Sequence, residues 1–303
     1  MTDLAVDLGF CTLQNPVIAA SGTFGYALEF QPFLDLNRLG GFVVKGLYYH
    51  PRPGNPPPRL VETAGGLINA IGLQGIGVER FAEDILPRLQ GLESALIVNV
   101  CGDHDEEYVA VVETLNGLEG ITAYELNISC PNVEQGGRCP AMDPEATYRI
   151  VKTVKKVSRR PCITKLTPNA ADISGVAVSA QEAGSDALSL VNTFLALAVD
   201  AESRRPELAN VLGGLSGPAI KPLALRMVYQ VAASVSVPVI GMGGIMSGAD
   251  AVEFLIAGAS AVQVGTANFV DPQATLNVIA GLEDYGRRHG LEKISVLTGA
   301  LRI

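Results

Sequence analysis

Short apolar runs alternate along the chain with longer stretches in which apolar residues recur every three or four positions. Eight of the short runs are rich in Val, Ile, Leu and Ala and are predicted as strands: residues 16–20, 41–45, 96–100, 123–127, 162–166, 187–191, 238–242 and 261–264. Apolar runs without polar alternation are typical of parallel strands covered on both faces. Because eight such strands can close a barrel, the pattern predicts an α/β fold, a single (β/α)8 TIM barrel spanning residues 1–303.

The starts of the intervening helices are marked in the sequence. Asp143 followed by Pro144 predicts an N-cap and a proline at the first helical position. Ser247 and Asp250 have the spacing of a capping box, and Gly258 predicts the end of that helix. Helices therefore follow most of the predicted strands.

Three connections are longer than the barrel requires. Residues 50–59 contain five prolines and predict a stiff excursion, and residues 192–217 predict a second excursion over the same face. Residues 131–142 carry Gly136 and Gly137, which suits a mobile lid. All three follow predicted strands, so we expect them at the C-terminal face of the barrel.

Composition and charge exclude several classes of protein. A hydrophobic fraction of 48% over 303 residues requires a large core, and the net charge of −9 argues against binding to nucleic acid. No leader-like N-terminus and no membrane-spanning apolar run is present in the sequence. The five cysteines form no CxxC pair, which favours reduced thiols. These features predict a cytoplasmic protein that binds neither nucleic acid nor membrane.

Polar residues and glycines stand where the predicted strands end, and in a barrel these ends meet at one mouth. Lys45 and Lys165 each end an apolar strand, where an unpaired ammonium is expensive to bury. One such lysine could simply extend to solvent. Two of them predict a mouth that binds an anion. The other strand-end residues are Ser21, Gly46, Asn99, Asn127, Asn192, Thr193, Gly243, Gly244, Gly265 and Thr266.

The glycines after the last two strands suit a phosphate site built from backbone N–H groups, although glycines also form ordinary tight turns. An apolar mouth that binds an anion and carries such a phosphate site fits FMN. Lys165 could then stabilise the negative charge of the reduced ring.

Cys130 follows the strand at residues 123–127 and lies between Asn127 and Asn132. It could be a buried structural cysteine, since free cysteines are often buried. The three histidines are isolated in the sequence, which argues against a metal site or a histidine-based triad. If the mouth removes a proton from a substrate, Cys130 is the candidate base. Asn132 could contact substrate or only form the turn after Pro131.

Five motifs taken together resemble those of the dihydroorotate dehydrogenase family. The resemblance covers essentially the whole chain and is to class 1B in particular, the catalytic subunit of the NAD-linked enzyme. Class 2 members use serine as the base and carry an N-terminal membrane element, whereas class 1A members reduce fumarate with one kind of subunit. The motifs are residues 69–74 (NAIGLQ), 127–132 (NISCPN), 192–193 (NT), 213–218 (GGLSGP) and 241–244 (GMGG).

The resemblance implies oxidation of (S)-dihydroorotate to orotate in the de novo synthesis of UMP. Cys130 would take the proton from C5 while hydride passes from C6 to flavin N5. FMN would be held by Ser21, Lys45, Gly46, Asn99, Asn127, Lys165, Val191, Gly217, Gly243, Gly244, Gly265 and Thr266. Dihydroorotate would be bound by Lys45, Asn69, Ala70, Ile71, Gly72, Leu73, Asn127, Asn192 and Thr193.

The resemblance also implies partners: a homodimer of this chain joined to an electron-transfer subunit with FAD and a [2Fe–2S] cluster, which together form a heterotetramer that reduces NAD⁺. The sequence agrees in one respect, since it lacks four clustered cysteines that could bind an iron–sulfur cluster. Three alternatives stay open: a class 1A-like enzyme that reduces fumarate, a flavin barrel acting on another dihydropyrimidine such as dihydrouracil, and a phosphate-binding structural subunit.

Overall fold

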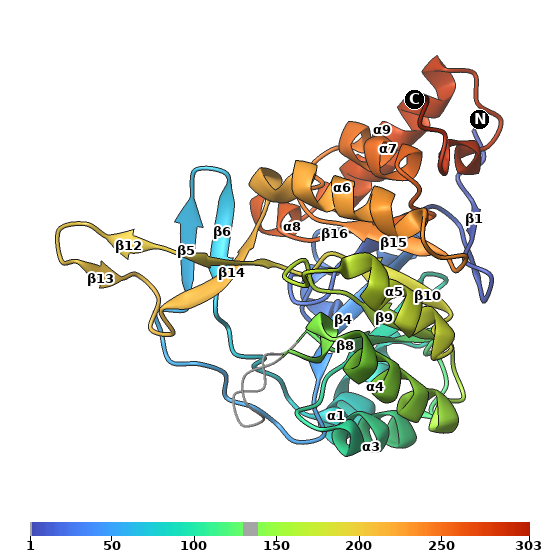
Figure 1. Ribbon diagram of the computed structural model, residues 1–303. Coiled ribbons are helices and arrows are strands. Elements are labelled where there is room, and N and C mark those ends of the chain that lie inside the picture. Colours follow the sequence, from blue (N-terminus) through green and yellow to red (C-terminus); the bar gives the residue numbers. More distant parts are fainter. Residues whose placement is uncertain (1, 130–138) are drawn as a thin grey trace.

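The computed structural model describes residues 2–129 and 139–303, and within them eight parallel strands close into a barrel (Figure 1). Going around the barrel, the order is β10-β15-β16-β3-β4-β7-β8-β9. All eight predicted strands and the predicted barrel are confirmed. The strands are β3 (Val17–Ala19), β4 (Gly41–Leu47), β7 (Ala95–Val100), β8 (Ala123–Asn127), β9 (Cys162–Lys165), β10 (Ala187–Leu190), β15 (Val239–Met242) and β16 (Ala261–Val264).

One strand is longer than the sequence indicated. β4 was predicted to end at Lys45, but it continues to Leu47 through an irregularity in its pairing with β7 between Val44 and Leu47. The buried Leu47 pairs again with Val100 beyond that point. Lys45 and Gly46 therefore lie within an irregular strand and not after its end. Bulges of this kind re-aim side chains and are common beside active sites.

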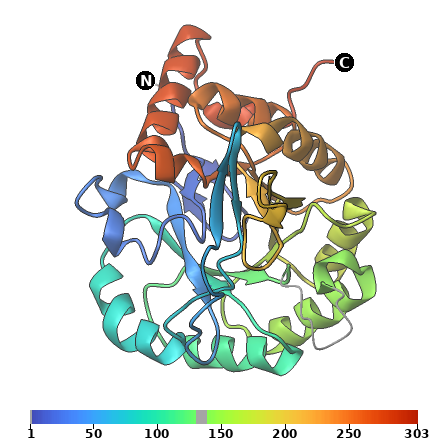
Figure 2. The same cartoon turned by 90° about the vertical axis from the view of Figure 1, so that its left-hand side faces the viewer.

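Helices surround the barrel (Figure 2). The Asp143 carboxylate accepts a hydrogen bond from the Glu145 N–H, and Ser247 and Asp250 form the predicted capping box. The helices are α1 (Val78–Arg80), α2 (Leu86–Leu89), α3 (Asp105–Leu115), α4 (Pro144–Val157), α5 (Ile173–Glu182), α6 (Lys221–Ala232), α7 (Gly248–Ile256), α8 (Ala267–Val270) and α9 (Ala274–Arg288), with a π-helical turn at Phe81–Ile85. Among the described residues, no helix is long and apolar enough to cross a bilayer.

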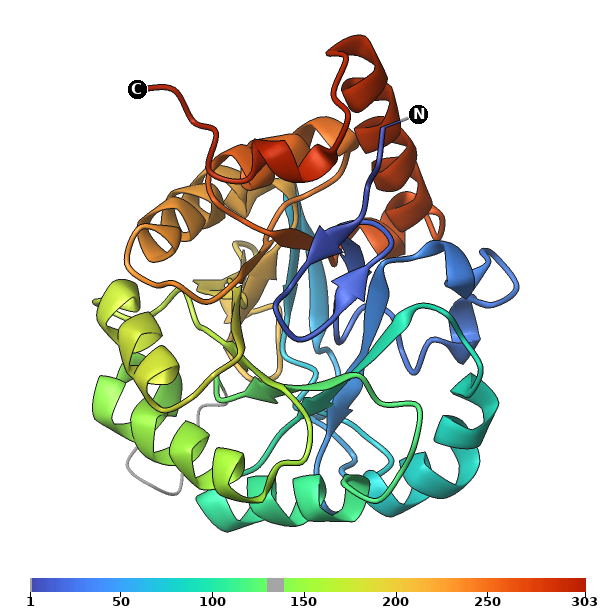
Figure 3. The ribbon, with the colours of Figure 1, turned by 90° about the vertical axis from the view of Figure 1, so that its right-hand side faces the viewer.

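Short 3-10 turns lie at Leu28–Phe30, Leu36–Arg38, Pro140–Met142, Pro218–Ile220 and Ile294–Leu297. At the barrel end opposite the mouth, β1 (Val6–Asp7) pairs with β2 (Thr12–Leu13), and Figure 3 shows this hairpin crossing that end. Leu8 and Leu13 are buried there. Both chain termini lie on this side of the molecule (Figure 1).

A separate antiparallel sheet, here called the excursion sheet, projects from the C-terminal face of the barrel (Figure 1). Its strand order is β11-β14-β6-β5, so the two predicted excursions pair with each other through β14 and β6. The sequence had not indicated this pairing. The strands are β5 (Leu60–Thr63), β6 (Gly66–Asn69), β11 (Phe194–Leu197) and β14 (Leu212–Ser216), and a hairpin of β12 (Val199–Asp200) and β13 (Arg205–Pro206) extends from it.

Candidate active site

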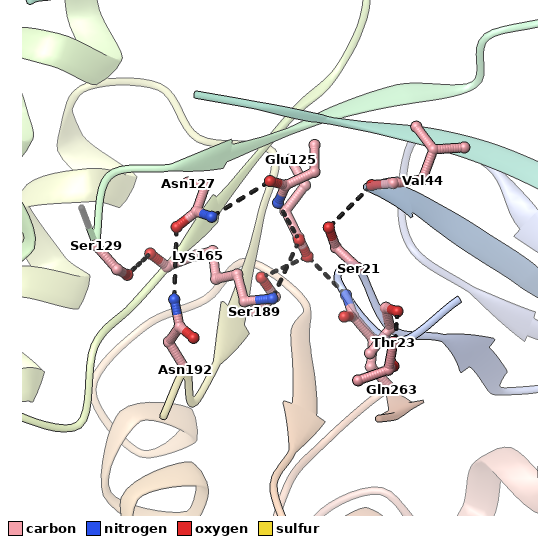
Figure 4. A network of polar contacts seen from close by, with 12 residues as sticks. Ser21, Thr23, Val44, Glu125, Asn127, Ser129, Lys165, Ser189, Asn192 and Gln263 are labelled. Carbon is pink, nitrogen blue, oxygen red and sulfur yellow. Dashed lines mark hydrogen bonds and ion pairs between the residues drawn. The ribbon is translucent and has the colours of Figure 1, made fainter. Parts of the chain in front are cut away.

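Glu125 lies in the barrel interior below the mouth. It is the middle residue of β8, so it points the same way as Asn127, two positions along the strand. Its side chain is fully buried. A carboxylate in such a place requires hydrogen-bond donors, and Figure 4 shows polar side chains from other strands converging on it.

Donors from the described residues reach both carboxylate oxygens of Glu125. Oε1 accepts from Asn99 Nδ2 at 2.8 Å and lies 3.5 Å from Lys165 Nζ. Oε2 accepts from Ser189 Oγ at 2.9 Å and from Gln263 Nε2 at 2.7 Å. The Gln263 bond comes from β16, which is four strands from β8 in either direction around the barrel. The contact therefore crosses the barrel interior and closes the floor of the mouth.

Lys165 is the last residue of β9 and is 5% exposed. The strand register places it beside Asn127 on one side and Ser189 on the other. Within the described part of the chain, its ammonium bonds to the Glu125 carboxylate and to no other acceptor. Because a lysine ammonium has three N–H donors, two remain for a ligand. The sequence predicted a lysine at the mouth, and the structure shows how its charge is balanced.

Three amide side chains continue from the floor towards the rim, and we call Asn99, Asn127 and Asn192 the amide relay. Asn127 Nδ2 donates to Asn99 Oδ1 at 3.3 Å, and Asn192 Nδ2 donates to Asn127 Oδ1 at 3.5 Å. The Tyr108 hydroxyl bonds to the backbone oxygen of Asn127 at 2.9 Å. Asn99 is fully buried, whereas Asn127 and Asn192 are partly exposed. The structure thus brings together residues from three different predicted strand ends.

Lys45 is partly buried on the irregular part of β4. Burial, followed by the positive charge of Arg59, holds the pKa of the Lys45 ammonium below its ordinary value, while Glu29 acts in the opposite direction. Its backbone N–H donates to Gly25 O at 2.8 Å. On the neighbouring residue, Val44 O accepts from Ser21 Oγ at 2.9 Å. A cation whose charged form is disfavoured in this way gains from binding an anion.

Three glycines of the predicted FMN site adopt backbone conformations that favour glycine. Gly217, Gly243 and Gly244 have φ values of 103°, 123° and 78°. A Cβ atom on Gly244 would lie 2.9 Å from Gly217 O and 2.8 Å from Lys221 N, so the loops after β14 and β15 are in close contact. After β16, Gly265 is followed by Thr266, whose hydroxyl bonds to Ser216 Oγ at 2.8 Å.

The predicted substrate loop at residues 69–73 is held by the proline-rich excursion. Asn55 donates from Nδ2 to Ala70 O at 2.9 Å and from its backbone to Ile71 O at 3.0 Å. Asn69 Nδ2 donates to Gly214 O at 3.1 Å across the excursion sheet. Gly72 and Leu73 both have positive φ, at 73° and 53°. A leucine in this conformation is uncommon and often marks a functional loop.

Thr193 and Val191 flank Asn192 at the end of β10. The Thr193 N–H donates to Asn192 Oδ1 at 2.9 Å, and Thr193 O accepts from Asn169 Nδ2 at 3.2 Å. Val191 is buried and follows a cis peptide. The Asn192 amide is therefore bonded on both sides, by its own neighbour and by Asn127.

Cys130, Asn132 and most of the predicted lid at residues 131–142 lie outside the described residues, so their predicted roles stay predictions. The chain enters this segment from Ser129, whose hydroxyl donates to Lys165 O at 3.3 Å. The cysteine thus follows a residue that contacts the end of β9.

Sequence reasoning missed the polar floor of the mouth and the residues that support the loops. These are Glu125, Ser189, Gln263, Asn55 and Asn169. A usable signal existed for the first three. Each is a polar residue in the interior of a predicted strand that is otherwise mostly apolar. The asparagines of the loops carry no comparable signal.

The model of the family described as "Dihydroorotate dehydrogenase" matches residues 3–285. The chain belongs to the dihydroorotate dehydrogenase family. It is 50% identical over 303 residues to a protein of Bacteroides thetaiotaomicron, with 100% of both chains covered, and 52% identical over 301 residues to one of Citrifermentans bemidjiense, with 99% of each chain covered. Both relatives are named "Dihydroorotate dehydrogenase B (NAD(+)), catalytic subunit".

Dihydroorotate dehydrogenases are flavin-dependent, and the residues at this mouth fit a flavin nucleotide. The glycine loops offer backbone N–H groups where a Cβ would intrude. Gln263 Oε1 is buried and has no hydrogen-bond partner among the described residues, so it can accept from a ring N–H. Lys165, which bonds to the other oxygen of the same Glu125 carboxylate, supplies a positive charge. The donor set is therefore suited to both ends of such a ligand.

Proposed function

We propose that this chain is the catalytic subunit of an NAD-linked dihydroorotate dehydrogenase, which oxidises (S)-dihydroorotate to orotate in the de novo synthesis of UMP. One observation carries the proposal: the amide relay starts at the same Glu125 oxygen that pairs with the Lys165 ammonium, and its middle residue, Asn127, lies beside Lys165 in the barrel sheet. Amide groups pair with both the donors and the acceptors of a pyrimidine ring without adding charge. The full-length identity to proteins named as such catalytic subunits supports it.

FMN is the proposed cofactor, and residues 1–303 are proposed to act as one FMN-binding domain. When bound, FMN would supply the acceptor for the hydride that leaves C6 of the substrate. The backbone N–H groups around Gly217, Gly243, Gly244, Gly265 and Thr266 would hold its phosphate. The remaining proposed contacts are Ser21, Lys45, Gly46, Asn99, Asn127, Lys165 and Val191, which line the mouth from neighbouring strands.

The proposed substrate contacts are Lys45, the loop at residues 69–73, Asn127, Asn192 and Thr193. The Lys45 ammonium, whose pKa is lowered by burial, would pair with the substrate carboxylate. The asparagines would form hydrogen bonds to the N–H and carbonyl groups of the substrate ring. An analogue lacking one of these groups would leave their amides unpaired. Preferential turnover of dihydrouracil, which has no carboxylate, would contradict the assignment of Lys45.

Cys130 is proposed as the general base that removes the proton from C5. It follows Ser129, which contacts the end of β9 beside Lys165. We expect Cys130→Ser to slow flavin reduction strongly near neutral pH and to recover partly at high pH, because a thiol titrates near pH ~8.5 and a hydroxyl is a far weaker acid. Stopped-flow reduction by dihydroorotate measures this. An unchanged rate would remove Cys130 from the role.

The proposed partners are a second copy of this chain and an electron-transfer subunit that carries FAD and a [2Fe–2S] cluster, in a cytoplasmic heterotetramer. The words "catalytic subunit" in the relatives' names support a partner. Exposed apolar side chains on the excursion sheet and its hairpin offer a surface for association. They are Leu60, Leu195, Leu197, Val199, Val211 and Leu212.

The decisive experiment is to purify the native complex, record its visible spectrum and measure reduction of NAD⁺ and of fumarate with dihydroorotate as donor. We expect flavin and iron–sulfur absorbance together with NAD⁺ reduction. A flavin-only protein that recruits no partner and reduces fumarate efficiently would contradict the NAD-linked assignment. Protein that stays colourless after FMN is added would contradict the flavin enzyme itself.

A further inference from the structure

We propose that Glu125 is a positioning residue, whose buried charge holds the Lys165 ammonium in place and sets the orientation of the amide relay towards the ligand. The inference rests on the proposed function and adds a residue that makes no contact with substrate in that proposal. It is carried by the contacts of the barrel floor, where one carboxylate joins Lys165 and the first amide of the relay at the same oxygen.

The direction of the relay follows from the carboxylate. Because an ionised carboxylate can only accept, Asn99 must turn its Nδ2 towards Glu125, at 2.8 Å. Asn99 Oδ1 then faces Asn127 and accepts from its Nδ2. That leaves Asn127 Oδ1 to accept from the amide of Asn192. Each amide orientation is consistent with the previous one, and the Thr193 N–H, which donates to Asn192 Oδ1 at 2.9 Å, supports the same direction from the rim.

The relay needs such an anchor because its upper contacts are long. The Asn99–Asn127 and Asn127–Asn192 distances are 3.3 and 3.5 Å, beyond the usual range for an N–H···O bond. The Thr193 N–H orients Asn192 from the rim at 2.9 Å, but the 3.5 Å contact passes this preference to Asn127 only weakly. The short bond from Asn99 to a charged oxygen gives it that preference, since hydrogen bonds to charged groups are about twice as strong as neutral ones.

The same oxygen of Glu125 balances Lys165. The side chains of this pair are 7% and 0% exposed, so water does little to screen either charge. With Glu125 present, the lysine is held as one half of an ion pair at the floor of the mouth. Without it, the ammonium would be uncompensated and would interact more strongly with any negative charge above it.

Glu125→Gln is a suitable test because the floor can accept an amide. The new Oε1 can keep the bonds from Asn99 and Lys165, and the new N–H₂ can donate to Ser189, whose hydroxyl also accepts. Gln263 can rotate its amide so that Oε1 receives the other N–H, which turns this oxygen away from a bound ligand and its N–H₂ towards it. The substitution thus removes the charge and keeps the shape.

The experiment compares the FMN-loaded wild-type protein with Glu125→Gln in two equilibrium measurements: orotate affinity by flavin difference absorbance, and the midpoint potential of bound FMN. We expect at least a tenfold weaker orotate affinity, because an amide at this position can present either its oxygen or its N–H₂ to Asn99 and so no longer imposes one direction on the relay. We also expect the preference for reduced over oxidised FMN to rise at least tenfold, a positive shift of about 30 mV for a two-electron couple. Wild-type values for both quantities would overturn the proposal.

Two further variants separate positioning from packing. Ser189→Ala removes one hydrogen bond from the same carboxylate but keeps its charge. We expect the potential to stay at the wild-type value in this variant, and an equal shift in Ser189→Ala and Glu125→Gln would overturn the proposal. If Glu125→Gln does not fold, Glu125→Asp is the test. This variant keeps the charge but shortens the side chain by one methylene, so the orotate affinity should fall at least threefold. An unchanged affinity would overturn the proposal.

These measurements distinguish the inference from the proposed function. Wild-type protein that binds neither FMN nor orotate would refute the function. Wild-type protein that binds both, with Glu125→Gln indistinguishable from it, would refute the positioning role alone.

Discussion

Removal of Lys165 tests the energetics of the barrel floor without any cofactor. Lys165→Met keeps most of the side-chain volume but leaves the Glu125 carboxylate buried without its cation. The two charged atoms are 3.5 Å apart, and at an effective dielectric constant of about 20 such a pair interacts with about 5 kcal/mol. Asn99, Ser189 and Gln263 still donate to the carboxylate. We therefore expect the free energy of unfolding to fall by about 3–5 kcal/mol, the usual range for breaking a buried pair.

A sharper prediction is the sign of the change in stability that a second substitution causes. Adding Glu125→Gln to Lys165→Met removes the uncompensated charge, so we expect the double variant to be more stable than Lys165→Met by about 2 kcal/mol or more. The assay is urea unfolding of the FMN-free proteins at pH 7, at low and high salt, with equal m-values required for the comparison. Because the pair is buried, its contribution should change little with salt.

An exposed ion pair of the same chain is the control. Arg80 and Asp84 lie 3.1 Å apart with side chains 69% and 58% exposed, so Arg80→Met should cost no more than about 0.5 kcal/mol. The reasoning would be refuted if Lys165→Met cost as little as this control. It would also be refuted if the double variant were less stable than Lys165→Met.

Three other predictions concern the mouth and the excursion sheet. Gly244→Ala should weaken FMN binding in a fluorescence titration at least tenfold, because its Cβ would meet Gly217 O. Gly290→Ala should leave the affinity unchanged, because Gly290 is also at positive φ but a Cβ there would have no atom within 4 Å. Equal affinities of the two variants would contradict the proposed phosphate site at the glycine loops. Burial lowers the pKa of Lys45 in the folded protein, so between the folded and unfolded pKa values the unfolded state binds more protons. The free energy of unfolding should therefore rise with pH through that alkaline window. Lys45→Met should abolish this rise in urea unfolding measured at several pH values, and an unchanged rise would assign it to another group. Leu195→Asp should lower the molar mass measured by light scattering. Val296→Asp should not, because this similarly exposed residue lies in the 3-10 turn Ile294–Leu297, which bonds to Asp3 near the N-terminus; an unchanged mass in Leu195→Asp would show that the excursion sheet takes no part in association.

The strands were predictable because a parallel barrel leaves a strong mark on the sequence. Each of its strands is buried on both faces, so each reads as a continuous apolar run, and the runs at residues 123–127 and 261–264 match β8 and β16 at both ends. Two helix starts were equally visible, since the Asp143 and Ser247 caps are local and depend on neighbours within a few residues. The positions of Lys45 and Lys165 near the mouth followed from the fold.

The floor of the mouth was not predictable in the same way. Glu125 and Gln263 are 138 residues apart, and each alone is a costly polar residue in an apolar strand. They become a favourable pair only when the sheet closes and places β8 opposite β16. The pairing of β6 with β14 in the excursion sheet is similar, because it joins segments that lie on separate loops of the chain. The irregularity in β4 also depends on its neighbour, since Leu47 pairs again with Val100.

The sequence by itself determined the eight strands of the barrel, their burial, two of the helix starts and the kinds of polar group at the strand ends, because these depend on local patterns and on which faces are covered. Its motifs also indicated the family. Tertiary structure decided which of those polar groups contact one another, such as Lys165 and Glu125, and in which direction the amides of the relay donate their hydrogen bonds. The reason is physical: the energy of a buried charge or amide depends on partners within about 3.5 Å, and in a closed barrel those partners come from distant parts of the chain.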